Sequence, residues 1–233
     1  MRVALAFALA LGTALCGCGM SDELPANQAT FAIEAKFELS TSNPSWRVPP
    51  PAGVPAWVCE GHAALVSDCC HTPSGGEFDC GRYPLRCDVD GFCALAFDYE
   101  VPFTVDLEAT PELDAFRGRA MTTAFLEEFT LLADGAVLPV RSMDLYVAPA
   151  GTSWSEAGAV YLATREPPTD RSEIRVPLSA AARASLASFL LDFHTPFDLV
   201  LVSHVVITRS QLGAGAYEWP MSVTFRGTVI ADF

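Results

Sequence analysis

Apolar and polar residues alternate with a period of two along several stretches of the chain. The first is 31–39, where Phe31 and every second residue after it are apolar and three of the intervening residues are charged. The same period continues through 95–107. Side chains of a β-strand point alternately to its two faces, so this pattern predicts strands with one buried and one solvated face.

The alternation at 95–107 places Asp98, Glu100 and Asp106 on one face, which we expect to face solvent. Pro102 lies on that face too. Proline cannot donate a backbone hydrogen bond, so this strand should lie at the edge of a sheet or break near its middle.

A continuous apolar and β-branched run at 197–208 predicts a central strand that is covered on both faces. The alternation returns in the last part of the chain, from Tyr217 to Val229. Further strands are expected at 137–147, 159–164 and 174–178.

One amphipathic helix is predicted over 180–193. Ser179 can cap its N-terminus, and Pro196 lies beyond its end. Four large apolar residues share a face at the spacing i, i+3, i+4, i+7, namely Leu186, Phe189, Leu190 and Phe193.

The segment 111–132 fits both periods. Phe125, Phe129 and Leu132 have helical spacing, whereas Phe125, Phe129 and Leu131 fit one side of a strand. We favour a strand, because Asp134-Gly135 is a turn signal and 137–147 would then be its hairpin partner. The whole pattern predicts a mainly β protein, an antiparallel β-sandwich of Ig-like or jelly-roll type with one amphipathic helix and a disulfide-rich insertion.

The first residues form a separate signal. Arg2 precedes an apolar run that ends in Leu15-Cys16-Gly17-Cys18 and is too short to span a bilayer. This ending resembles the lipobox of bacterial lipoproteins, which implies cleavage after Gly17 and lipid attachment to Cys18. Two rival interpretations are a frame that ends at Cys16, with Leu15 in a position that requires a small residue, and a plain secretory peptide.

The resemblance also implies a location. Gly19 rather than aspartate follows Cys18, which under the enterobacterial sorting rule favours the outer membrane. Two or more acyl chains anchor a protein stably, so lipidation would replace a transmembrane helix. We expect a signal peptide at 1–17, a tether at 18–28 and one domain at 29–233, with a proline-rich loop at 40–56 and a cysteine-rich segment at 57–93.

Six cysteines follow the lipobox, all within the cysteine-rich segment: Cys59, Cys69, Cys70, Cys80, Cys87 and Cys93. An even, clustered number in an exported chain predicts disulfides. A hairpin around Val89-Asp90-Gly91 would bring Cys87 opposite Cys93, and we predict that these two are bonded. Cys69 and Cys70 would then pair with Cys59 and Cys80, in an order that the sequence leaves open.

The chain is acidic, with 28 Asp and Glu against 14 Lys and Arg and a net charge of −14. Such a surface has no electrostatic attraction for nucleic acid, so we expect no nucleic-acid partner.

The sequence contains no catalytic motif of a serine hydrolase or a zinc protease. His194 and His204 are interpreted as surface or packed residues, and we expect no metal or other cofactor. Aromatic residues at Trp154, Tyr146 and Tyr161, with Trp57, Tyr217 and Trp219, would suit either the core or a carbohydrate-stacking surface. Trp154 is the best candidate for a ligand contact, because nothing around it suggests burial.

Together these features predict a lipid-anchored cell-envelope protein that acts as a non-enzymatic binding or interaction module. Its partners would be the membrane, through the anchor, and a protein, a glycan or a hydrophobic ligand. One alternative is a carrier of a hydrophobic ligand, with an apolar pocket between the sheets under the helix. A second is an envelope hydrolase that uses carboxylates or a metal.

Overall fold

The computed structural model describes residues 27–39, 85–87, 93–135, 140–166, 173–192, 194–207 and 221–233. The predictions made for the signal peptide with Cys18, for most of the tether and for the proline-rich loop lie outside these residues. So do Phe193 and four of the cysteines, namely Cys59, Cys69, Cys70 and Cys80.

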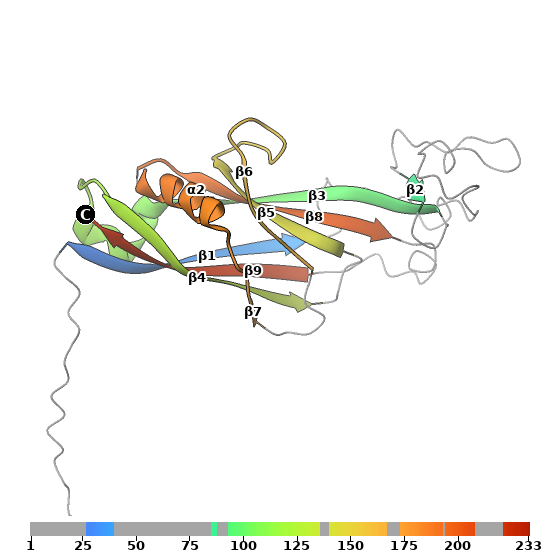
Figure 1. Cartoon of the computed structure of the whole chain (residues 1–233), viewed down its shortest axis with the longest axis horizontal. Coiled ribbons are helices and arrows are strands. Elements are labelled where there is room, and N and C mark those ends of the chain that lie inside the picture. Colours follow the sequence, from blue (N-terminus) through green and yellow to red (C-terminus); the bar gives the residue numbers. More distant parts are fainter. Residues whose placement is uncertain are drawn as a thin grey trace, which may run out of the picture.

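The described residues form two antiparallel sheets (Figure 1). The four-stranded sheet has the order β1-β9-β4-β7, from β1 (Gln28–Leu39), β9 (Met221–Asp232), β4 (Thr123–Gly135) and β7 (Glu173–Arg175). The five-stranded sheet has the order β2-β3-β8-β5-β6, from β2 (Leu85–Cys87), β3 (Cys93–Val105), β8 (Phe197–Ile207), β5 (Val140–Pro149) and β6 (Val160–Arg165). Two short 3-10 helices, η2 (Leu107–Ala109) and η3 (Pro111–Phe116), follow β3.

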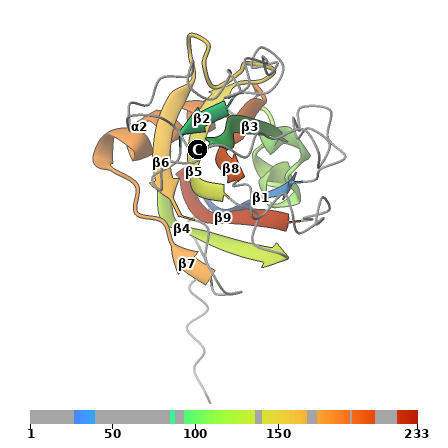
Figure 2. The ribbon, with the colours of Figure 1, turned by 90° about the vertical axis from the view of Figure 1, so that its right-hand side faces the viewer.

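Seen end-on, the two sheets form two layers, and the helix α2 (Ala180–Leu191) lies at one flank (Figure 2). One apolar core contains buried side chains of both sheets and of α2. The predicted mainly β architecture with two packed antiparallel sheets is therefore confirmed. No helix of the described residues has the length and apolar character needed to cross a membrane.

The alternation of β1 is reproduced in its burial. Every second residue from Ala29 to Leu39 is buried, whereas Ala32, Glu34, Lys36 and Glu38 between them are exposed. Phe37 contacts Phe103 of the other sheet and Phe225 of β9, with ring centroids 6.0 and 5.8 Å apart. Phe37 thus joins the two sheets at the centre of the core.

Strand β8 is central, as predicted, with β3 on one side and β5 on the other. Its residues from Phe197 to Ser203 are all buried, because one face packs on the core and the other is covered from outside. On β3, the described strand β2 pairs only as far as Leu95. Pro102 therefore lies on an edge that no described strand pairs with, in agreement with the prediction.

Helix α2 begins as predicted. The Ser179 side chain accepts a hydrogen bond from the Ala182 backbone N–H at 3.0 Å. Leu186 and Leu190 are buried, and Phe189 packs partly buried against the core. The helix contacts β4 of one sheet and β6 of the other, so it covers the flank between them.

Two predictions around β4 need correction. The segment 111–132 is a strand only from Thr123, since 111–116 forms η3. Phe125 is 56% exposed although Phe129 and Leu131 are buried. The reason is a register shift between Leu126 and Glu128, which reverses the alternation and buries Leu126 instead.

The predicted hairpin between 111–132 and 137–147 is also wrong. Strand β4 pairs with β9 and β7, whereas β5 belongs to the other sheet and pairs with β8 and β6. The chain therefore passes from one sheet to the other between Gly135 and Val140. A local turn signal marks the end of a strand but does not determine which sheet receives the next one.

Candidate functional site on the outer face of the five-stranded sheet

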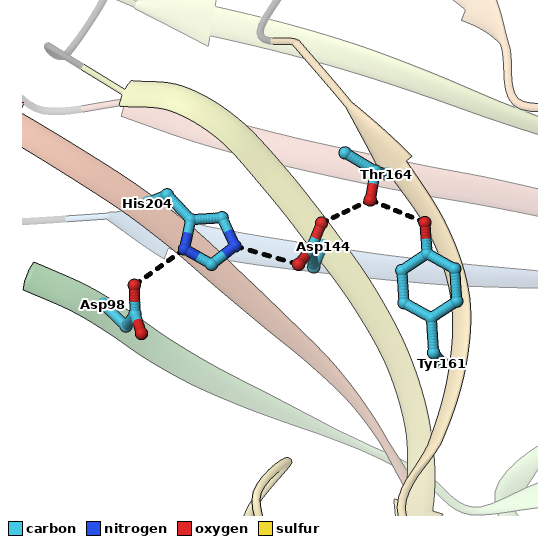
Figure 3. A network of polar contacts seen from close by, with 5 residues as sticks. All are labelled: Asp98, Asp144, Tyr161, Thr164 and His204. Carbon is cyan, nitrogen blue, oxygen red and sulfur yellow. Dashed lines mark hydrogen bonds and ion pairs between the residues drawn. The ribbon is translucent and has the colours of Figure 1, made fainter.

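The outer face of the five-stranded sheet carries a polar network centred on His204 (Figure 3). The β3/β8 register places Asp98 opposite His204, and Asp144 lies on neighbouring β5. His204 Nδ1 lies 2.7 Å from Asp98 Oδ1, and His204 Nε2 lies 2.9 Å from Asp144 Oδ2. A single imidazole therefore bridges carboxylates from the two strands beside it.

The network continues to β6, where Thr164 lies opposite Asp144. Thr164 Oγ1 donates to Asp144 Oδ1 at 2.5 Å and lies 2.6 Å from the Tyr161 hydroxyl. Because the single hydroxyl proton of Thr164 points to the carboxylate, the Tyr161 hydroxyl donates to Thr164. Four strands are thus connected through side chains on one face.

The surroundings of His204 change its protonation. Partial burial lowers the pKa of His204, but hydrogen bonds and charge interactions with Asp144 and Asp98 raise it by more, so the net shift is upward. The imidazolium is therefore favoured to a higher pH than for a histidine in water.

Two further aromatic rings lie close to Tyr161, at the edge of this network. Tyr146 contacts Trp154 and Tyr161, with ring centroids 5.7 and 5.6 Å apart. The rings of Tyr146 and Trp154 pack on a small apolar cluster on the outer face, formed by Ala148, Val200 and Val202. Burial raises the pKa of Tyr146, and the nearby charges of Asp144, Tyr161 and Asp98 raise it further.

Trp154 belongs to the loop 150–159, which two carboxylates hold onto the sheet. Glu100 accepts from the Ser153 hydroxyl at 2.9 Å and from the Trp154 backbone N–H at 3.1 Å. Buried Asp198 accepts from the Gly151 N–H at 2.7 Å and from the Thr104 hydroxyl at 2.6 Å. Gly151 has φ +79°, a conformation that favours glycine, where the loop leaves β5.

One prediction about this face is wrong. Trp154 is partly buried rather than free of packing, because the loop folds back on the sheet. The prediction that the acidic face of β3 faces solvent is confirmed for Asp98 and Asp106, which are exposed, whereas Glu100 is partly buried where it holds the loop. The sequence offered one clue to this arrangement: Asp98, Asp144 and His204 are polar residues within segments that it predicts as strands.

Other candidate residues lie apart from the network. His194 Nδ1 is 2.7 Å from Glu108 Oε1, and Asp106 caps η2 by accepting from the Glu108 N–H. Trp57, Tyr217 and Trp219 lie outside the described residues. Within the described part of the chain, no three His, Cys, Asp or Glu side chains are arranged to hold a metal ion.

Cys87 and Cys93 are each disulfide-bonded, and they oppose each other in the β2/β3 register. The predicted opposition of the two residues is confirmed, and a bond between them stays a prediction.

A cavity of about 280 Å³ lies at the C-terminal end of α2. It is lined by Pro149, Ser188, Phe189, Asp192, Thr195 and Pro196. It therefore opens beside the end of the helix, whereas the predicted ligand pocket was placed between the sheets.

Comparison with known proteins gives no family. No protein-family model matches the chain, and no curated protein matches it. Among solved structures, one titled Desmodium yellow mottle tymovirus is similar at 11% sequence identity and a TM-score of 0.25, covering 90% of this chain and 91% of that chain. The fold and the site thus define only a mainly β protein with two antiparallel sheets and a polar, aromatic outer face.

Proposed function

We propose that this protein is a lipid-anchored component of the bacterial cell envelope, held at the outer membrane through Cys18, whose domain acts as a non-enzymatic binding module. The lipobox resemblance of Leu15-Cys16-Gly17-Cys18 supports the anchor. The first described strand begins at Gln28, so a short tether would place the domain next to the lipid surface.

We further propose that the two sheets form a sandwich of Ig-like or jelly-roll type, stapled by disulfides within 57–93. Both Cys87 and Cys93 are disulfide-bonded, which supports the staple, and the even number of cysteines after the lipobox agrees with it. The oxidising envelope is the compartment in which such bonds persist.

The binding surface would be the outer face around Tyr146, Trp154 and Tyr161. The observation that carries this proposal is the juxtaposition of the three rings with carboxylates of the same face. Tyr161 is 48% exposed, and Asp98, beside the rings, is 48% exposed in its side chain. A surface that combines aromatic rings with hydrogen-bond acceptors suits a ligand with both apolar and hydroxyl groups.

A glycan has this chemistry. The C–H faces of a sugar ring pack on aromatic rings, and its hydroxyl groups donate hydrogen bonds to carboxylates such as Asp98. The net charge of −14 argues for a neutral glycan rather than an acidic one.

The test is a binding assay of the chain, purified from its membrane in detergent, against a panel of neutral oligosaccharides that includes cellohexaose and chitohexaose. We expect Tyr161→Ala to weaken binding about tenfold, which corresponds to the loss of about 1.4 kcal/mol of ring contact. Phe125→Ala is the matched control, because it removes an exposed aromatic ring from the other sheet.

Equal binding by wild type and Tyr161→Ala would show that the ligand does not bind at this surface. Failure of the wild type to bind any neutral glycan would rule out the glycan as ligand. The hydrophobic-carrier alternative would gain support if a fatty acid bound instead and the binding were sensitive to Phe189→Ala in the cavity beside α2.

A further inference from the structure

The bridge between Asp98, His204 and Asp144 requires a particular protonation state. A neutral imidazole has one N–H, so it can donate to one carboxylate only. Both ring nitrogens of His204 lie within hydrogen-bond distance of a carboxylate oxygen, at 2.7 and 2.9 Å. The geometry is satisfied when His204 is an imidazolium that donates to both.

The charges around His204 are mainly negative. Asp98 faces it from β3, with Glu100 next on the same face, and Asp144 faces it from β5. Tyr161 and Thr164 follow on β6, and Asp198 lies farther along β8 itself. No lysine or arginine of the described residues forms an ion pair with Asp98 or Asp144. Within the described part of the face, a protonated His204 would therefore be the one positive charge that joins them.

We propose that His204 is a proton-dependent joint that controls the position of Tyr161 on the binding surface. The protonated ring holds Asp98 and Asp144 together, and Asp144 in turn orients Thr164 and Tyr161. When the ring loses a proton, one nitrogen presents a lone pair to a carboxylate, and that contact becomes repulsive. We expect this to be the longer contact, between Nε2 and Asp144 at 2.9 Å, so that Asp144 is released and Tyr161 loses its hydrogen-bonded support beside Tyr146.

The pH dependence of the bridge follows from the upward shift in the pKa of His204. The pKa of His204 in the folded protein lies above its ordinary value of 6.5. The bridge therefore stabilises the protein fully below about pH 6.5, and this contribution is lost as the pH rises through the folded pKa. Tyr161 should be fixed at mildly acidic pH and released at alkaline pH.

An NMR titration of the purified chain, with labelled histidine and tyrosine, tests this joint. We expect His204 to titrate with a midpoint above 6.5 and the Tyr161 ring signals to change with the same midpoint. In Asp98→Asn and Asp144→Asn, the His204 midpoint should fall below that of the wild type, because each variant removes one of the two negative charges.

Thr164→Val tests whether the titration of His204 reaches Tyr161 through Thr164. This variant removes the hydroxyl between Asp144 and Tyr161, so His204 should still titrate while Tyr161 no longer follows it. His194→Gln is the control, because His194 pairs with Glu108 away from the network. A His204 midpoint at or below 6.5, a proton held on Asp98 or Asp144 instead, or an independent Tyr161 would overturn the inference.

The effect on binding rests on the proposed function, whereas the titration does not. For the hexaose that binds the wild type, affinity should fall severalfold from pH 6 to pH 9, and Thr164→Val should flatten this dependence. A coupled titration without any glycan binding would contradict the proposed function but leave the joint intact. Glycan binding without a coupled titration would support the proposed function and contradict the role of His204.

Discussion

Replacing Phe37 by alanine is expected to lower the free energy of unfolding by about 3–5 kcal/mol, the range for removing a buried phenylalanine from a packed core. Phe37 is fully buried and contacts Phe103 of the five-stranded sheet as well as Phe225 of its own sheet. The cavity left by the ring would lie where the two sheets meet, so neither sheet can close it alone. Denaturant unfolding of both proteins gives this difference from the midpoints at a common slope.

Phe125→Ala is the control for this experiment, because the same ring is lost from a side chain that is 56% exposed. It should change the free energy of unfolding by less than about 1 kcal/mol. Similar losses for the two variants would show that Phe37 is not at the centre of a core shared by the sheets.

Replacing Asp198 by alanine should cost about 2–3 kcal/mol, because it removes a buried carboxylate that accepts two hydrogen bonds. Asp198 is 2% exposed and accepts from the Gly151 N–H and the Thr104 hydroxyl. We therefore expect two consequences of this substitution. The whole protein becomes less stable, and the loop that carries Trp154 is held less firmly.

Amide hydrogen exchange separates the two effects. In Asp198→Ala, the Gly151 N–H should exchange faster under native conditions, while the Trp154 N–H, which Glu100 accepts, should change less. Glu112→Ala is the control, because it removes a negative charge from an exposed position. It should leave the exchange of both amides unchanged and alter the free energy of unfolding by less than about 0.5 kcal/mol. Unchanged exchange at Gly151 in Asp198→Ala would contradict the role of this carboxylate in holding the loop.

The sequence allowed the strands to be predicted better than their partners. Burial in β1 and β8 follows the patterns of 31–39 and 197–208. In β1 every second side chain is buried, and in β8 nearly every side chain is buried. The pairing of β4 with β9 depends on residues almost a hundred positions apart. A local pattern contains no information on that choice, which is why the hairpin after Asp134-Gly135 was wrong.

The site was predicted only in fragments for the same reason. Asp98, Asp144 and His204 come together through the registers of β3, β8 and β5, and each alone is an ordinary residue of a strand. Trp154, Tyr146 and Tyr161 were candidates for a stacking surface, and the structure brings these three together. The loop that half-buries Trp154 depends on Glu100 and Asp198, whose contacts cross between elements.

The outer face thus carries both the aromatic rings and the ionisable His204, whose hydrogen-bond network reaches one of those rings. Tyr161 lies at the end of the hydrogen-bonded chain from His204 and at the edge of the aromatic cluster. A change in protonation at one position can therefore alter the shape of the proposed binding surface without unfolding either sheet.

Whether the protein is lipid-anchored and disulfide-stapled is tested by the intact mass of the chain extracted from its native membrane, measured before and after reduction and alkylation. We expect a chain that begins at Cys18 and carries a lipid-sized increment, with the six remaining cysteines alkylated only after reduction. A chain without lipid that begins at another residue would contradict the anchor. Thiols that react before reduction would contradict the disulfides.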